Sequence, residues 1–151
     1  MIEEDLVFID LEARNREEVI GKMAGSLVKK GYVTDGFVEA VLERECKFPT
    51  GLPSAIPVAI PHEDAKYCKR SALAVATLKE PVAFREMGNP ENELPVRLVF
   101  LFALNDPDMQ VTWLQKLSTL LGCTHFLERV LSTTERRALV MELEKALGKG
   151  E

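Results

Sequence analysis

The chain has 151 residues, of which 46% are hydrophobic and 28% charged, and its formal net charge is −5. This balance predicts one globular domain with a sizeable core, spanning residues 1–151. The acidic charge argues against nucleic-acid binding, because a phosphate backbone is held by a basic stripe and the basic residues here are scattered. The longest uncharged apolar run, Leu98 to Leu104, is too short to span a bilayer, so we expect no membrane insertion.

The cysteines and the N-terminus indicate the cellular compartment. Cys46, Cys68 and Cys123 are far apart and form no CxxC pair and no metal-ligand spacing. We expect reduced thiols at core or near-surface positions. The segment Met1–Asp5 is acidic, and no basic stretch followed by an apolar one is visible, so no secretory signal is expected. Both features predict a cytoplasmic protein.

The first elements predicted along the chain are a strand over Leu6–Leu11 and a helix over Arg16–Lys30. Asn15 precedes the helix as a plausible cap, and Gly31 follows it as a stop signal. The apolar residues of the helix recur at helical spacing: Val19, Ile20, Met23, Leu27 and Val28.

A second helix is expected to start at a cap formed by Thr34 or Asp35 and to end near Phe48. Prolines and a glycine break the pattern after it, so Pro49–Ile56 is predicted to be a loop. That loop leads into a short apolar strand before His62.

Two strongly apolar runs follow, Ala72–Leu78 and Val96–Leu104, and such runs suit strands covered on both faces. Between them the sequence predicts a short strand-like Val82–Phe84 and a polar loop, Gly88–Glu93. With helices before and after these strands, the pattern predicts a single-domain layered α/β sandwich, with a mixed central sheet flanked by helices.

The C-terminal third is predicted to be helical. Asn105–Asp108 has the character of a helix start, and Gly122 marks the end of that helix. Phe126–Leu131 fits a short helix, and a last one, capped by Thr133 or Thr134, runs to residue 147. The first of these helices carries an apolar stripe, with Trp113 at its flank as core edge or interface anchor: Val111, Leu114, Leu117, Leu120 and Leu121.

The most informative stretch of the chain is Pro57–His62, where an apolar strand ends at a proline and a histidine follows at once. A histidine at a strand end is fixed in direction and still reachable, and imidazole can attack phosphorus or bind a metal. One alternative is a strand-end histidine without chemistry. Another is a metal-dependent hydrolase that uses His62 with Glu63 and Asp64, although adjacent residues rarely converge on one ion.

A phosphoryl-transfer role for His62 needs a donor that neutralises the phosphoryl oxygens. Arg44 is the preferred candidate, because a guanidinium matches phosphate oxygens in a two-pronged fashion. The alternative for this arginine is a surface ion pair with Glu43 or Glu45 on the same helix end.

Several motifs occur in a characteristic order, and together they cover roughly residues 4 to 147. They are Leu42-Glu43-Arg44-Glu45, Phe48-Pro49-Thr50-Gly51-Leu52, Val58-Ala59-Ile60-Pro61-His62, Pro95-Val96-Arg97-Leu98-Val99-Phe100 and Asp108-Met109-Gln110. This combination resembles the IIA domain of the fructose/mannitol class of the bacterial phosphoenolpyruvate-dependent sugar phosphotransferase system. Within that class, the Pro49–Pro53 loop, the Ile60–Asp64 ending and the Asn105–Asp108 segment are most similar to galactitol-type IIA proteins.

The resemblance implies a fold like that of mannitol and fructose IIA and a role for His62 as phosphoryl acceptor. His62 takes the group from the phosphocarrier protein HPr and passes it to a cysteine of the IIB component, with the tele nitrogen, Nε2, as the candidate position. Arg44 takes the place of the family's phosphate-stabilising arginine. The sugar, expected to be galactitol, is handled by the membrane component IIC. No metal and no cofactor is implied.

One departure from the family pattern concerns the residue after the long central strand. Fructose and mannitol members usually carry a second histidine there, and Asp108 stands in its place, where a carboxylate repels a phosphoryl group. Backbone amides at the start of that helix are expected to supply some of the missing stabilisation.

Thr50, Asp64 and Asp108 are secondary site candidates, Asp64 as a turn cap or as a residue that orients a ring. His125 is too far along the chain to replace the missing histidine and is expected to cap or pack in a short helix. IIA-like domains also control other proteins through their phosphorylation state. The alternative function is therefore a regulatory binding module that is not dedicated to sugar transport.

Overall fold

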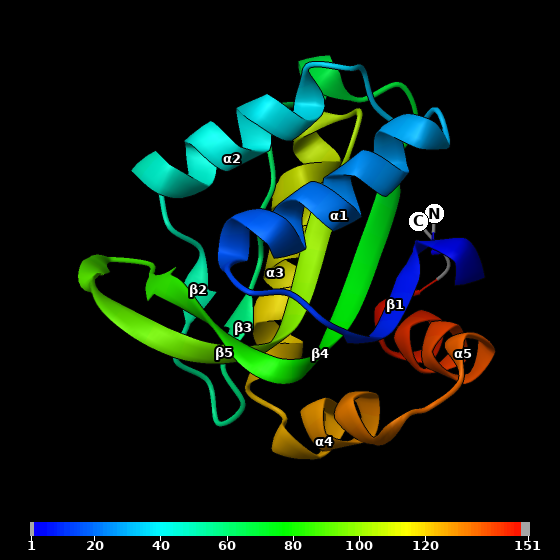
Figure 1. Cartoon of the computed structure of the whole chain (residues 1–151). Helices are drawn as coiled ribbons and strands as arrows, with labels where there is room; N and C mark the ends of the chain where they lie inside the picture. Colours follow the sequence, from blue (N-terminus) through cyan, green and yellow to red (C-terminus); the bar gives the residue numbers. More distant parts are fainter. Residues whose placement is uncertain (1, 149–151) are drawn as a thin grey trace.

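The computed structural model describes residues 2–148, which form a layered α/β fold around one mixed sheet. The strand order is β1-β4-β2-β3-β5, and β4 also pairs directly with β5 (Figure 1). The strands are β1 (Val7–Leu11), β2 (Gly51–Leu52), β3 (Val58–Ala59), β4 (Ala72–Glu86) and β5 (Asn89–Ala103). The helices are α1 (Arg16–Lys29), α2 (Phe37–Lys47), α3 (Pro107–Leu121), α4 (Thr124–Ser132) and α5 (Arg136–Leu147). The predicted fold class is confirmed.

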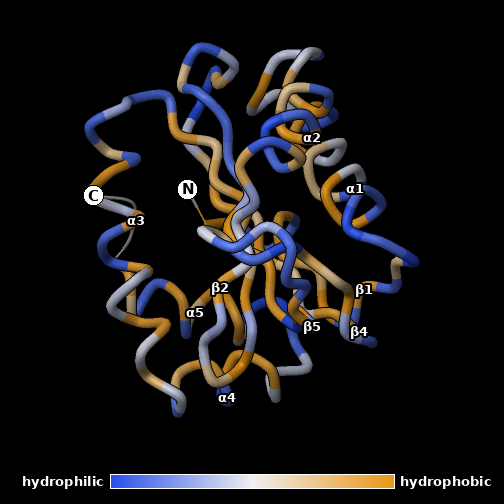
Figure 2. Tube along the Cα trace, turned by 90° about the vertical axis from the view of Figure 1, so that its left-hand side faces the viewer, coloured by the Kyte–Doolittle hydropathy of each residue, from blue (hydrophilic) through white to orange (hydrophobic). Residues whose placement is uncertain are grey.

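Helices cover both faces of the sheet, which explains why residues 72–78 of β4 and 96–103 of β5 are almost entirely apolar, with Thr77 and Arg97 as the exceptions. Successive side chains of a strand point to opposite faces. In β4, Leu73 and Val75 therefore pack with α3, α4 and α5, whereas Ala74 and Ala76 pack with α1 and α2. In the tube view the apolar colouring gathers along the strands between these two layers (Figure 2). The sequence prediction of strands covered on both faces is correct.

The long hairpin of β4 and β5 is larger than the sequence indicated. The predicted strand Val82–Phe84 is part of β4, and the predicted polar loop Gly88–Glu93 is mostly β5. The hairpin turns at Met87 and Gly88, where the glycine has φ +83°. Residues 89–93 of β5 are exposed at every position, so no buried residue marked this segment as a strand, and the loop prediction was wrong.

Helix starts agree with the sequence for α1 and for α3, which is capped by Asp106 within the predicted Asn105–Asp108 start, and differ for α2 and α5. The Asn15 side chain accepts a hydrogen bond from the Glu18 amide at 2.9 Å and caps α1, as predicted. The cap position of α2 is Gly36, not Thr34 or Asp35, and that of α5 is Glu135, not Thr133 or Thr134. The predictions were wrong because packing, not a side-chain cap, sets these two starts: neither cap residue makes a side-chain hydrogen bond.

Two minor expectations, for Trp113 and His125, are also corrected. Trp113 of α3 is fully buried in the apolar cluster between the sheet and helices α3, α4 and α5, so it is neither core edge nor an exposed anchor. All three thiols are free, and Cys46 and Cys123 are exposed while Cys68 is partly buried, which agrees with the near-surface alternative. His125 lies exposed in the first turn of α4, where it neither caps nor packs. None of the helices within residues 2–148 combines the length and apolar character needed to cross a bilayer.

Candidate functional site

His62 lies just beyond the C-terminal end of β3, next to the C-terminal end of β5. The β3 strand pairs in parallel with β5, and an isolated bridge continues this pairing from His62 to Phe102. The amide of Phe102 donates to the carbonyl of Pro61 at 3.2 Å. Pro61 has no backbone N–H and cannot donate a hydrogen bond to a neighbouring strand, so this end of the segment is held through its carbonyl by β5. The histidine is thus anchored by a rigid element, as the sequence predicted.

The ring of His62 is held by its own strand. Nδ1 lies 2.8 Å from the carbonyl oxygen of Ile60. A carbonyl only accepts, so Nδ1 carries the hydrogen and the neutral ring keeps its lone pair on Nε2. Nε2 has no hydrogen-bond partner within residues 2–148 and is not among the fully buried unpaired polar atoms, so it is not sealed from solvent. This is the arrangement that a nucleophilic imidazole requires.

Burial is the main influence on the protonation of His62. Desolvation lowers the pKa of the ring below its ordinary value of 6.5, and the nearby charge of Arg44 lowers it further. The hydrogen bond to Ile60 and the carboxylates of Glu63 and Asp64 act in the opposite direction. Because the lowering influences prevail, the ring is neutral at physiological pH and its lone pair on Nε2 is free.

Arg44, in the last turn of α2, reaches the residues that directly follow His62. Its Nη1 lies 3.6 Å from Oε1 of Glu63 and 3.9 Å from Oδ1 of Asp64. Its guanidinium carbon lies 5.7 Å from the ring centre of the exposed Phe48, and its buried Nε has no partner. These contacts line one wall of a shallow cavity of about 240 Å³. The alternative of a surface pair with Glu43 or Glu45 is wrong, because Glu43 pairs with Lys47.

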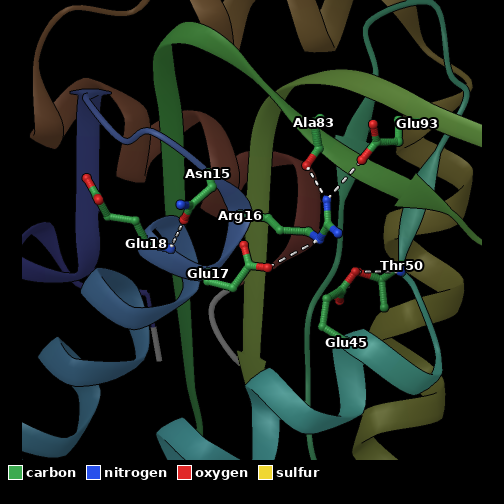
Figure 3. A network of polar contacts seen from close by, with 8 residues as sticks. All are labelled: Asn15, Arg16, Glu17, Glu18, Glu45, Thr50, Ala83 and Glu93. Atoms are coloured by element: carbon green, nitrogen blue, oxygen red, sulfur yellow. Dashed lines mark hydrogen bonds and ion pairs between the residues drawn. The ribbon is translucent and has the colours of Figure 1, made fainter.

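Glu45 is a site residue that the sequence analysis missed. Its side chain points away from Arg44 into the protein, where only 6% of the residue is exposed. One carboxylate oxygen accepts from the Thr50 amide at 2.9 Å and the other from the Thr50 hydroxyl at 2.7 Å (Figure 3). Desolvation raises the pKa of this carboxyl from 4.5 to about 6, against the lowering effect of the Thr50 bonds and of Arg16. The only sequence signal for it is its position beside Arg44.

Thr50, a secondary candidate, connects Glu45 to the strand that carries His62. The amide of Ile60 donates to the Thr50 hydroxyl oxygen at 3.2 Å and to the Thr50 carbonyl at 3.3 Å. The next residue, Gly51, lies so close to β4 that an added Cβ would sit 2.6 Å from the carbonyl oxygen of Arg85. The Pro-Thr-Gly motif thus has a packing reason: threonine bonds the strand and glycine permits the close approach.

Asp108 and its helix start do not join the site as expected. Asp108 is exposed at the start of α3, and no hydrogen bond or ion pair within the described residues links it to His62 or Arg44. Its amide is bonded to the Asp106 side chain at 3.0 Å, and the amides of Met109 and Gln110 donate to the Asp106 carbonyl. The amides expected to stabilise a phosphoryl group are therefore already engaged by Asp106.

The hydrolase alternative requires several ligands around one ion. Within residues 2–148, no group of three or more His, Cys, Asp or Glu side chains is arranged to hold a metal. Asp64 is mostly exposed, with its amide bonded to the Glu63 side chain at 2.8 Å, and it contacts Arg44. Its side chain makes no cap bond at the turn that follows (Ala65–Tyr67), so the expected capping role is wrong.

Comparison with known proteins places this geometry in a family. The sequence model of the family described as "Phosphoenolpyruvate-dependent sugar phosphotransferase system, EIIA 2" matches residues 1–146. The chain is 41% identical over 107 residues to the transcriptional regulator ManR of Bacillus subtilis, covering 71% of this chain and only 15% of that protein. It is 29% identical over 122 residues to the galactitol-specific EIIA component of Escherichia coli, covering 80% of this chain and 81% of that protein.

Solved structures show the same fold. The mannitol IIA enzyme of Escherichia coli, solved in complex with phosphorylated enzyme IIB, superimposes with a TM-score of 0.73 at 27% identity. The match covers 97% of this chain and 98% of that one. A IIA protein from Streptococcus mutans superimposes with a TM-score of 0.78 at 19% identity, covering 95% and 90% of the two chains, which supports the fold alone.

Proposed function

The chain belongs to the EIIA 2 family of the phosphoenolpyruvate-dependent sugar phosphotransferase system, and from this membership we propose that it is a histidine phosphocarrier. His62 accepts a phosphoryl group from phospho-HPr and passes it to a cysteine of a IIB component. The observation that carries the proposal is the 2.8 Å bond from Nδ1 of His62 to the Ile60 carbonyl. This bond presents the other ring nitrogen, Nε2, as the nucleophile.

The transfer step balances without a cofactor. The lone pair on Nε2 of His62 attacks the phosphorus of the incoming phosphohistidine, the new N–P bond forms, and the donor's P–N bond breaks. The donor imidazole leaves with the electron pair. In the second step, a cysteine thiolate of IIB attacks the same phosphorus, and His62 returns to its neutral form. Such transfers depend mainly on positioning and on neutralisation of charge.

Arg44 provides the neutralising charge in this proposal. In the free protein its guanidinium is held by Glu63 and Asp64 in loose pairs of 3.6 and 3.9 Å. A phosphoryl group carries more charge than either carboxylate and offers geometry for two parallel hydrogen bonds. We therefore expect Arg44 to exchange these carboxylates for the phosphoryl oxygens when His62 is modified.

The partners and the location follow from the same proposal. HPr and IIB are the macromolecular partners, the IIC membrane component acts indirectly, and the whole relay works in the cytoplasm. Galactitol is the proposed sugar, supported by the motif resemblance and by 29% identity to a galactitol-specific EIIA component. The sugar itself does not contact this chain.

The test is phosphorylation from phosphoenolpyruvate with purified enzyme I and HPr. His62→Gln should abolish labelling, whereas His125→Gln, which alters the only other histidine, should leave it unchanged. Labelled wild type should then transfer the group to a galactitol-type IIB and lose its label. Undiminished labelling of His62→Gln would contradict the phosphocarrier role.

A second candidate function is a phosphorylation-dependent regulatory module. It is favoured by the 41% identity to a segment of the transcriptional regulator ManR, of which the chain spans 15%. Both functions use phosphorylation of His62, and they differ in the next step. Labelling by phospho-HPr without transfer to any candidate IIB, together with phosphorylation-dependent binding to a regulator, would favour the regulatory role.

A further inference from the structure

We propose that Glu45 is a positioning residue for phosphoryl transfer: its buried carboxylate acts through Thr50 and Ile60 to orient the ring of His62, and it sets the place of Arg44 relative to that ring. This inference rests on the proposed role of His62. Glu45 itself does not contact the reacting nitrogen.

The first part of the argument is a continuous series of hydrogen bonds. The Glu45 carboxylate accepts from the Thr50 hydroxyl at 2.7 Å, which turns the lone pairs of that hydroxyl toward the amide of Ile60 at 3.2 Å. The carbonyl of Ile60 then accepts from Nδ1 of His62 at 2.8 Å. Every bond in the series has one available direction, because an ionised carboxylate and a carbonyl only accept. The Ile60 carbonyl favours the Nδ1–H tautomer, and the bonds from Thr50 and Glu45 hold in place the residue that carries this carbonyl.

The second part of the argument is the neighbour relation of Glu45 and Arg44. Consecutive helical residues point about 100° apart, a consequence of 3.6 residues per turn. Glu45 thus fastens the end of α2 to the loop before β3 while Arg44 extends toward Glu63 and Asp64. One carboxylate fixes the helix that carries the cation against the strand that carries the nucleophile.

A buried carboxylate is a costly way to make a purely structural link. Burial raises the pKa of Glu45 to about 6, so the charged form is disfavoured by its surroundings. The cation that acts on it is Arg16 of α1, which is itself engaged by Glu93 and the Ala83 carbonyl, both at 3.2 Å (Figure 3). Arg85 of β4 and Glu17 of α1 line a second small cavity, separate from the one at Arg44, which Arg16 and Glu45 also border. The two hydrogen bonds from Thr50 offset part of the cost of burying the Glu45 carboxylate, so a buried carboxylate at this position depends on Thr50.

The experiment reads the ring of His62 directly. In protein labelled with ¹⁵N-histidine, NMR gives the fractions of the Nδ1–H and Nε2–H tautomers, and a parallel assay gives the rate of labelling by phospho-HPr. Thr50→Val removes the hydroxyl at nearly constant volume, and Thr50→Ser retains it. The matched control is Thr77→Val, because Thr77 is equally buried and its hydroxyl also accepts from a backbone amide, that of Asp10 at 2.9 Å.

We expect Thr50→Val and Glu45→Gln to lower the Nδ1–H fraction and to slow labelling on the order of tenfold. Thr50→Ser should restore both readouts, and Thr77→Val should change neither. Because Glu45 acts through Thr50, Glu45→Gln should add little to Thr50→Val in the double variant. Circular dichroism confirms that each variant is folded, and Glu45→Gln keeps the test available if valine is not tolerated at position 50.

The inference is overturned if the tautomer fractions stay at wild-type values in both Thr50→Val and Glu45→Gln, or if the effect of Glu45→Gln is undiminished beside Thr50→Val. Its failure is distinguishable from failure of the proposed function. The tautomer is measured without any phosphoryl donor, whereas the proposed function fails when His62→Gln is still labelled.

Discussion

Replacement of Glu45 by glutamine should change how the stability of the protein depends on pH. The folded protein holds the pKa of this carboxyl at about 6, above its ordinary value of 4.5. Between these values the native state keeps a proton that the unfolded chain has released, so this group's contribution to the free energy of unfolding falls as pH rises. The interval corresponds to about 2 kcal/mol, since a tenfold change in an equilibrium is worth about 1.4 kcal/mol.

The assay is urea unfolding of wild type and Glu45→Gln at pH 4, 5, 6 and 7. The fluorescence of Trp113 reports unfolding, because it is the only tryptophan and is fully buried. Glutamine cannot titrate, so wild type minus variant should fall by about 2 kcal/mol from pH 4 to pH 7. His62 changes its contribution with pH in the opposite direction, but it is present in both proteins and cancels.

Glu43→Gln is the matched control for this measurement. Glu43 lies two residues earlier on the same helix, is exposed, and has its pKa lowered by its hydrogen bond and ion pair with Lys47. A carboxyl of that kind contributes stability that is lost as pH falls, so its difference curve should not decline as pH rises. A flat or rising difference for Glu45→Gln would refute the claim that this carboxylate is buried at an energetic cost.

Three further predictions concern the site. Arg44→Gln should slow labelling from phospho-HPr on the order of 10- to 100-fold, whereas Lys47→Gln, which removes a charge from the same helix turn, should change it little; equal rates for all three proteins would contradict the role of Arg44. Gly51→Ala should lower the free energy of unfolding by about 1–3 kcal/mol in a urea titration, because its Cβ would sit 2.6 Å from a backbone oxygen of β4. Gly25→Ala, with no atom within 4 Å of the new methyl, should not destabilise, and similar losses at both sites would argue against the close-approach explanation. The labelling rate should fall to half its maximum only at a pH below 6.5, because burial lowers the pKa of His62; a rate already halved at pH 6.5 or above would contradict this.

Much of the fold could be predicted from periodicity, and the failures have physical causes. The covered halves of β4 and β5 are almost entirely apolar, apart from Thr77 and Arg97, and were easy to recognise. Their outer halves include exposed residues such as Lys79 and Glu91, which carry little strand propensity. Their pairing comes from the partner strand, and no local pattern reveals it.

The site was predicted in part for the same reason. His62 and Arg44 stand out because their residue types carry chemistry and their motifs resemble a family. Glu45 does not stand out, because a glutamate in an amphipathic helix is usually solvated. The burial of Glu45 depends on Thr50, which lies five residues later, after α2 has ended, and on Ile60 further along the chain. Asp108 stands at the position of the family's second histidine, and its part in the site stays a prediction, because within residues 2–148 it makes no bond to His62 or Arg44.

The most direct test of the account is to locate the phosphoryl group itself. Protein labelled with ¹⁵N-histidine and phosphorylated through HPr should show phosphorus coupled to Nε2 of His62, while Nδ1 keeps its hydrogen and its bond to Ile60. Phosphorus on Nδ1, or on a residue other than His62, would contradict the account.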